Sequence, residues 1–138
     1  MEFVTSISMK VTVSVEQEKQ LASKETILRT CRQDNVVAFD IFHQGVLIGF
    51  VMLREYEKGG FFLWAFAIDR MYQNQGLGTR ALNDLIRYMN LYHAMHTITT
   101  TYKLGNEHAK HVYEKIGFVE TDIVDEPDCH EVDMSFKP

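Results

Sequence analysis

A glycine-containing turn has the residue types of an anion-binding site, and it runs Gln73-Asn74-Gln75-Gly76-Leu77-Gly78-Thr79. The apolar segment before it, residues 61–68, predicts a buried strand. After it, apolar residues recur every three or four positions, as in a helix with one buried face; these are Leu77, Ala81, Leu82, Leu85, Ile86 and Met89. Backbone N–H groups at the start of such a helix are unpaired, and the helix dipole adds positive potential. A pyrophosphate is the predicted anion, because Gly76 and Gly78 have no Cβ atom to block its approach.

The same turn is also compatible with a dinucleotide site or with a tight turn that binds nothing. Gly76-x-Gly78-x-x-Ala81 fits the dinucleotide fingerprint G-x-G-x-x-G/A. That fingerprint normally carries an Asp or Glu about 20 residues further on, whereas the next predicted strand, 97–102, has no carboxylate. The chain also lacks the repeated strand–helix–strand alternation of a dinucleotide-binding domain. A dinucleotide site is therefore less favoured by the sequence than a pyrophosphate site of another kind.

A second segment, about thirty residues further on, places polar and small residues on one helix face. Asn106 is a good N-cap and Gly117 a good residue to end a helix, so a short helix is predicted between them. At about 100° per residue, Asn106, Ala109 and Tyr113 fall on one stripe of this helix. Small Ala109 would allow a ligand to lie flat against the helix, with the Tyr113 hydroxyl at one end.

Together, these two segments resemble the GNAT superfamily of acyl-CoA-dependent N-acetyltransferases. Gln73-x-x-Gly76-x-Gly78 is similar to the pyrophosphate motif of the family, and Asn106-x-x-Ala109-x-x-x-Tyr113-x-x-x-Gly117-Phe118 to its second cofactor-facing segment. The resemblance implies an α+β (mixed α/β) fold with a mostly antiparallel mixed sheet. Helices would cover both faces, and a V-shaped cofactor cleft would open between two diverging strands. It also implies one domain over residues 1–138.

The resemblance implies transfer of an acetyl group from acetyl-CoA to a primary amine. Tyr113 would be the general acid that protonates the departing thiolate. Residues that would bind the cosubstrate are Phe66, Ala67 and Ile68 on the strand, Gln73, Asn74, Gln75, Gly76, Leu77, Gly78 and Thr79 in the turn, and Asn106, Ala109 and Tyr113 on the short helix. A non-catalytic acyl-CoA-binding domain is the alternative from a different functional class.

The acceptor amine is less well defined by the sequence. Segments 38–42, 46–50 and 63–69, together with 15–20, resemble bacterial spermine/spermidine acetyltransferases within the family. Other members with similar motifs acetylate peptide N-termini, lysines or aminoglycosides, and these classes remain alternatives. Candidates for acceptor contact or general base are Glu55, Glu57 and Glu131, although a solvated surface role is the more common one for each. Trp64 is expected in the core, with the acceptor pocket as the alternative.

Composition limits the other possibilities. The 138 residues, of which 46% are hydrophobic, can build one domain with a sizeable core. A net charge of −5 argues against general nucleic-acid binding, and no apolar segment approaches the roughly 18 residues of a membrane span. We expect a cytoplasmic protein with Cys31 and Cys129 as free thiols. Two histidine pairs, His93 with His96 and His108 with His111, have no third ligand nearby in sequence, so no metal is expected. A homodimer is compatible with the family.

The remaining pattern predicts the elements that position these residues. Residues 16–30 predict a helix, and 11–15 a strand or an extension of it. Residues 36–42 and 46–53 predict a hairpin. A helix over 79–91 and strands over 97–102, 118–124 and 130–136 follow. The part before the hairpin is shorter than in most GNAT proteins, which leaves open whether an N-terminal strand or helix is missing.

Overall fold

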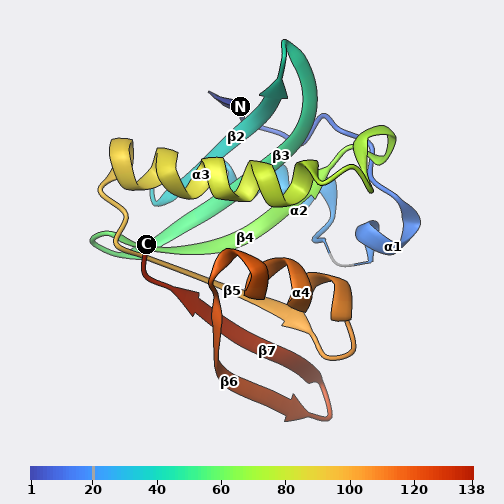
Figure 1. Ribbon diagram of the computed structural model, residues 1–138, viewed down its shortest axis with the longest axis vertical. Coiled ribbons are helices and arrows are strands. Elements are labelled where there is room, and N and C mark those ends of the chain that lie inside the picture. Colours follow the sequence, from blue (N-terminus) through green and yellow to red (C-terminus); the bar gives the residue numbers. More distant parts are fainter. Residues whose placement is uncertain (20) are drawn as a thin grey trace.

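A seven-stranded sheet runs through the computed structural model, which describes residues 1–19 and 21–138 (Figure 1). Its strand order is β1-β2-β3-β4-β5-β7-β6, and only the β4–β5 pair is parallel. The fold class expected from the sequence is therefore confirmed. The elements are β1 (Glu2–Thr5), α1 (Val15–Glu18), α2 (Lys24–Thr30), β2 (Val36–His43), β3 (Val46–Glu57), β4 (Gly60–Ile68), the 3-10 turn η1 (Arg70–Tyr72), α3 (Leu77–His93), β5 (Thr97–Lys103), α4 (Glu107–Ile116), β6 (Val119–Glu126) and β7 (Cys129–Phe136).

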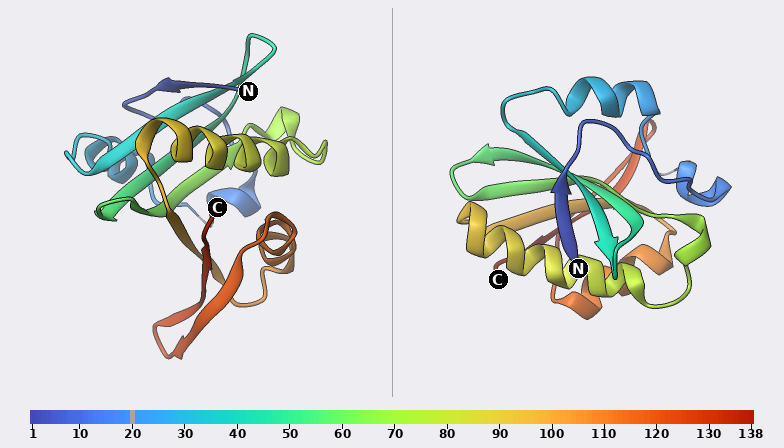
Figure 2. Two further views of the ribbon diagram at one scale, coloured as in Figure 1. Left: turned by 60° about the vertical axis from the view of Figure 1, so that its left-hand side comes forward. Right: turned by 90° about the horizontal axis from the view of Figure 1, so that it is seen from above.

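Helices cover both faces of the sheet, and α2 and α3 lie on opposite sides of it (Figure 2). On one face, α3 buries the stripe that the sequence predicts: Ala81, Leu82, Leu85, Ile86 and Met89. The first residue of that stripe, Leu77, is only partly buried. Ala109, Tyr113 and Ile116 of α4 pack against the same hydrophobic cluster. On the other face, Ile27 of α2 joins a second cluster with Met9, Val11 and the inward residues of β2, β3 and β4.

The N-terminal third differs most from the sequence-based expectation. The helix predicted over 16–30 is wrong, because the chain forms two short helices there, and Gln20, which that helix includes, lies outside the described residues. Each helix begins at its own serine cap: Ser14 Oγ accepts from the Gln17 N–H, and Ser23 Oγ from the Thr26 N–H. A serine inside a helical pattern competes for backbone hydrogen bonds and favours a new helix start.

An N-terminal strand and two helices do precede the hairpin. β1 pairs antiparallel with β2, with Phe3 opposite Ile41, and extends the sheet at one edge. The segment 11–14 is neither strand nor helix, although its Val11 side chain is buried. The four residues of β1 alternate only weakly, and so short a pattern does not predict an edge strand from sequence.

The other predictions of local structure are confirmed. Five of these predictions lie within observed elements that extend a few residues further: the hairpin, the strands at 61–68, 97–102 and 130–136, and the helix at 79–91. The strand predicted at 118–124 is observed one residue later, from Val119 to Glu126. Cys31 and Cys129 are both free. None of the helices in the described part of the chain is long and apolar enough to cross a membrane.

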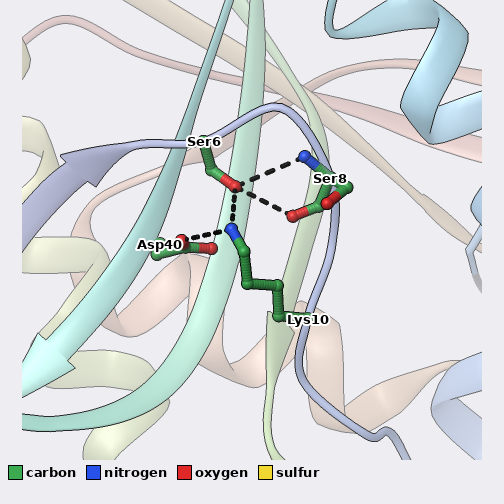
Figure 3. Close-up of polar contacts among 4 residues, drawn as sticks. All are labelled: Ser6, Ser8, Lys10 and Asp40. Atoms are coloured by element: carbon green, nitrogen blue, oxygen red, sulfur yellow. Dashed lines mark hydrogen bonds and ion pairs between the residues drawn. The ribbon is translucent and has the colours of Figure 1, made fainter.

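A partly buried ion pair fixes the segment before α1 to the sheet (Figure 3). Lys10 Nζ lies 2.8 Å from Asp40 Oδ2 and 3.1 Å from Ser6 Oγ, and the Ser6 hydroxyl donates to the Ser8 carbonyl at 2.8 Å. Asp40 is buried on β2, and its second oxygen, Oδ1, has no hydrogen-bond partner among the described residues. Lys10 therefore supplies the charge that makes burial of this carboxylate tolerable.

Replacing Lys10 by Met should lower the free energy of unfolding at pH 7 by about 1–3 kcal/mol, because the buried Asp40 carboxylate loses its charged partner. Urea unfolding followed by circular dichroism measures this. The double variant Lys10→Met/Asp40→Leu should recover most of the loss, since no buried charge is then left unpaired. Equal destabilisation of the single and double variants would show that the lone carboxylate is not the cause of the loss.

Candidate active site

A V-shaped cleft opens where β4 and β5 separate. Their parallel ladder has only three pairs, from Gly60 opposite Thr97 to Phe62 opposite Thr99. At the apex the Thr100 hydroxyl donates to the Leu63 carbonyl at 3.3 Å. Beyond this point β5 continues beside β7 while β4 stays with β3. The diverging strands predicted from the sequence are therefore present, and the edge of β4 beyond the apex faces the cleft.

A bulge in β4 lies directly at the apex. The register against β3 shifts between the pairs Met52–Ala65 and Leu53–Leu63, which makes Trp64 the extra residue. Leu63 packs in the cluster under α3, whereas Ala65 and Ala67 pack in the cluster under α2. The bulge leaves Trp64 exposed, with 36% of its surface accessible, so the expectation that it belongs to the core is wrong.

Beyond the bulge, every second residue of β4 directs its backbone N–H and C=O groups toward the cleft. The Asp69 N–H donates to the Ile48 carbonyl at 2.7 Å, which makes this a hydrogen-bonded pair of the β3–β4 ladder. Since hydrogen-bonded and non-hydrogen-bonded pairs alternate, Ala67 bonds to β3, and Phe66 and Ile68 direct their N–H and C=O groups toward the cleft. The Ile68 carbonyl already accepts from Gln73 Nε2 at 2.9 Å. Within the described part of the chain, the free groups on this edge are therefore those of Phe66 and the Ile68 N–H.

The predicted anion-binding turn begins α3 without a side-chain cap. Gly76 is the N-cap residue, with φ of +75°, a conformation that glycine adopts without strain. The N–H groups of Leu77, Gly78 and Thr79 in the first helical turn have no acceptor within the helix and point outward from its end. A Cβ added to Gly78 would meet only Ile68 Cγ1, at 3.6 Å. The fold itself therefore does not require a glycine at position 78.

The Gln73 side chain stabilises the turn through hydrogen bonds to two neighbouring segments. Its side-chain amide bonds both to the Ile68 carbonyl and to Gln17 Oε1 of α1. Asn74 has φ of +62°, and the exposed Gln75 donates to the Met71 carbonyl at 3.4 Å. Gln73 thus holds the turn, the end of β4 and α1 together, while Asn74 and Gln75 shape the loop.

The short helix α4 carries the second set of predicted residues. Asn106 Oδ1 caps the helix by accepting from the Ala109 N–H at 3.1 Å, as the sequence predicts. Ala109 and Tyr113 are half-buried against the core, and the Tyr113 ring lies 5.4 Å from that of Phe118. Burial raises the pKa of Tyr113, and the neighbouring Thr100 hydroxyl opposes this in part. Tyr113 therefore remains a protonated phenol at neutral pH.

Side chains from β4, β5, α4 and β7 line one groove of about 140 Å³. It brings together six residues singled out from the sequence: Trp64, Phe66, Asn106, Ala109, Tyr113 and Glu131. Glu55 lies elsewhere, because its carboxylate accepts from the Gly59 N–H at 3.1 Å in the β3–β4 turn. Glu57, at the end of β3, is exposed and does not line the groove either.

Several groove residues escaped the sequence analysis. From α1 and the segment after it come Gln17 and Leu21, and from β5 come Thr100, Thr101 and Lys103. Gln17 lies in the 15–20 segment that resembles polyamine acetyltransferases, and Thr100 and Thr101 lie on the predicted strand 97–102, but no catalytic or binding motif marks any of the five. They reach the groove through contacts distant in sequence. The Lys103 ammonium, for example, donates to the Lys19 carbonyl at 2.9 Å. Only the position of β5 beside the predicted cleft could have indicated its residues.

The wall formed by β7 is acidic on the face opposite α4. Glu131 pairs with Lys103 and Asp133 with Thr101, so these side chains share the face turned away from the buried Tyr102 and Val132. Burial, followed by the charges of Asp122 and Glu131, raises the pKa of Asp133. Lys103 lies on the same face and also lines the groove, so the two carboxylates of this wall are partly balanced there by one ammonium.

Among the described residues, no group of three His, Cys, Asp or Glu side chains is placed to hold a metal ion. Of the two histidine pairs noted in the sequence, His108 and His111 are exposed. His93 instead packs edge-on against Phe39, at 6.0 Å between ring centroids, and His96 contacts the Lys58 carbonyl at 2.9 Å.

Several solved structures with a similar fold are acetyltransferases. Spermidine N-acetyltransferase from Vibrio cholerae (F149A mutant) superposes with a TM-score of 0.71 at 21% identity, covering 83% of this chain and 72% of that one. A GNAT family acetyltransferase from Elizabethkingia anophelis with acetyl-CoA bound gives 0.71 at 18% identity, covering 97% and 98%. The ribosomal-protein-S18-alanine N-acetyltransferase from Escherichia coli gives 0.70 at 20% identity, covering 94% and 92%. At these identities the likeness concerns the fold.

Sequence comparison gives the family. Spermine/spermidine N(1)-acetyltransferase from Bacillus subtilis (strain 168) is 32% identical over 85 residues, and a probable spermine N(1)-acetyltransferase from Bacillus subtilis subsp. natto matches equally well. The alignment spans 56% of this chain and 56% of each relative. The model of the acetyltransferase (GNAT) family matches residues 2–118, most of the chain. The chain therefore belongs to the acetyltransferase (GNAT) family.

Proposed function

We propose that this chain transfers an acetyl group from acetyl-CoA to a primary amine. The observation that carries the proposal is the free edge of β4 in the cleft, flanked by an uncapped helix start at one end and by Tyr113 across the groove. Membership of the family and the fold shared with an acetyl-CoA-bound structure support it.

The groups present fit acetyl-CoA. Outward N–H groups from Leu77 to Thr79 suit its pyrophosphate, since a helix start binds anions. The free C=O group of Phe66 and the free N–H group of Ile68 suit the amides of an extended pantetheine arm, which would add to β4 like a strand. Half-buried Ala109 leaves space beside the arm, and the side-chain N–H groups of Asn106 can donate to it. When bound, acetyl-CoA supplies the thioester acetyl group.

Tyr113 holds the proton that the leaving sulfur needs. An acid must be protonated before the reaction, and the raised pKa of Tyr113 ensures this at neutral pH. As the bond between the sulfur and the acetyl carbon breaks and negative charge develops on the sulfur, the Tyr113 proton passes to it, so that CoA leaves as a neutral thiol. The free Phe66 N–H on the β4 edge is placed to polarise the acetyl carbonyl, as in an oxyanion hole.

Replacing Tyr113 by Phe should lower kcat about 100-fold or more and change the KM for acetyl-CoA little, because general acid catalysis is lost and binding is not. Steady-state release of CoA measures both constants. In the unchanged protein, activity should show no loss from Tyr113 ionisation until the pH exceeds about 10, since the pKa is raised above that ordinary value.

Tyr92→Phe is the matched control, because Tyr92 is an exposed tyrosine of α3 remote from the groove. Its kcat should equal that of the unchanged protein. A Tyr113→Phe variant with unchanged kcat would remove the acid role from this residue.

Gly78→Ala tests the pyrophosphate site separately from the fold. The added methyl group has ordinary space in the free protein, so the free energy of unfolding should stay equal or rise by up to about 1 kcal/mol. The same methyl group stands where the pyrophosphate would lie, so the KM for acetyl-CoA should rise about tenfold or more.

Gly76→Ala provides the contrast. It should destabilise the protein by about 1–2 kcal/mol, because alanine is strained at a φ of +75°. Unfolding curves with and without acetyl-CoA distinguish the two variants. An unchanged KM in Gly78→Ala would argue against pyrophosphate binding at this turn.

The amine must arrive at the thioester without its extra proton, since an ammonium has no free electron pair. Of the three carboxylates considered from the sequence, Glu131 alone lines the groove. We assign it the binding of the acceptor ammonium and acceptance of its proton. The names of the curated relatives suggest a polyamine as acceptor, and peptide N-termini, lysines and aminoglycosides are the other classes.

Release of CoA from acetyl-CoA with a panel of these amines tests the proposal, with mass spectrometry of the products. Amine-dependent release is expected, and Glu131→Gln should lower kcat/KM for the acceptor by about tenfold or more while acetyl-CoA binding persists. Acetyl-CoA binding without transfer to any amine would instead favour a non-catalytic acyl-CoA-binding domain.

A further inference from the structure

A second hollow of about 150 Å³ lies directly beside the groove, with Trp64 as the wall common to both. It is on the α2 face of the sheet. Thr30 and Gln33 border it from the end of α2 and the turn that follows, and Val36, Met52 and Arg54 border it from β2 and β3. Because Trp64 is the bulge residue next to the apex of the cleft, the hollow begins where an acceptor amine would react.

Arg54 gives this hollow its charge. It pairs with Val36 on one side and Phe62 on the other, and its guanidinium carbon lies 5.8 Å from the centre of the Phe62 ring. Among the described residues no carboxylate lies within ion-pair distance of it, and no acidic side chain lines the hollow. An exposed arginine held over an aromatic ring keeps its planar donors available to a carboxylate.

The charged side chains differ on the two sides of Trp64. The groove holds one carboxylate, Glu131, and one ammonium, Lys103, which donates to the Lys19 carbonyl at 2.9 Å, and Asp133 follows Glu131 on the same face of β7. Arg54 lines the hollow together with the neutral hydrogen-bonding side chains of Thr30 and Gln33. A molecule that extends across Trp64 meets a carboxylate at one end and a guanidinium at the other.

We propose that the acceptor is a primary amine that also carries a carboxylate. Its amine lies in the groove beside Trp64 and Glu131, and its carboxylate lies in the hollow against Arg54. This inference rests on the proposed acetyl transfer and specifies its acceptor. A diamine or polyamine would place a second ammonium beside the Arg54 guanidinium, where like charges repel.

The experiment compares amines that differ only at the far end: 5-aminopentanoate, pentylamine and 1,5-diaminopentane, with shorter and longer homologues of each. Acetyl transfer at low salt gives kcat/KM for every compound. The carboxylate series should exceed the uncharged series by about tenfold, because a charge-assisted hydrogen bond is gained. The uncharged series should exceed the diamine series. A diamine preference in the unchanged protein would overturn the inference.

Substitution of Arg54 sharpens the comparison. Arg54→Gln should abolish the advantage of the carboxylate, and Arg54→Glu should reverse it in favour of the diamine. Arg87→Glu makes the same change in net charge at an exposed position of α3, on the other face of the sheet. It should preserve the order of kcat/KM among the three series of amines. Equal orders in Arg54→Glu and Arg87→Glu would overturn the role of Arg54.

The carboxylate site can still be tested if the protein transfers no acetyl group. If no amine is acetylated, calorimetric binding of the same three compounds in the presence of CoA decides the inference by itself. Binding of 5-aminopentanoate that is lost in Arg54→Glu would support the carboxylate site in a protein without transferase activity. Absence of such binding, or stronger binding of the diamine, would reject it.

Discussion

The separation of β4 from β5 is the constraint on which the site depends. A strand in the middle of a sheet normally has both edges paired, and an unpaired buried edge is costly. Here the ladder ends after three pairs, and the Thr100 hydroxyl and the Gln73 amide satisfy two of the carbonyls near the opening. The groups of Phe66 and the N–H of Ile68 remain for a ligand. The cleft is therefore a gap in hydrogen bonding that an extended, amide-containing molecule can fill.

The two sides of the cleft are built in different ways. On one side, α3 and α4 pack in the larger hydrophobic cluster, which holds the helix start and Tyr113 in place. On the other side, Ile27 packs α2 into the second hydrophobic cluster, whereas four-residue α1 is held by its serine cap and by the contact between Gln17 and Gln73. The Lys10–Asp40 ion pair fixes the segment before α1. Because elements with few buried contacts open at low free energy, we expect the α1 side of the cleft to open more easily than the side formed by α3 and α4.

Sequence reasoning succeeded where the signal was local. The buried stripe of α3, the Asn106 cap and the stripe through Ala109 and Tyr113 all follow from helical spacing and capping, and the structure has them. It failed at the N-terminal segment, where Ser23 was not recognised as the start of a new helix. It also failed at Trp64, because an unbroken apolar run hides which residues face which side. Lys103 and Gln17 reach the groove through distant pairing, which one sequence does not reveal.

The bulge at Trp64 adds one residue to β4 without changing the faces that its neighbours occupy. Leu63 and Ala65, on either side of it, lie opposite Leu53 and Met52 and pack in different hydrophobic clusters. Deletion of Trp64 would therefore give a regular ladder in which Phe66 and Ile68 keep their present faces. The alternation of β4 does not need a residue at position 64, so what this residue adds to the fold is one exposed side chain at the apex of the cleft.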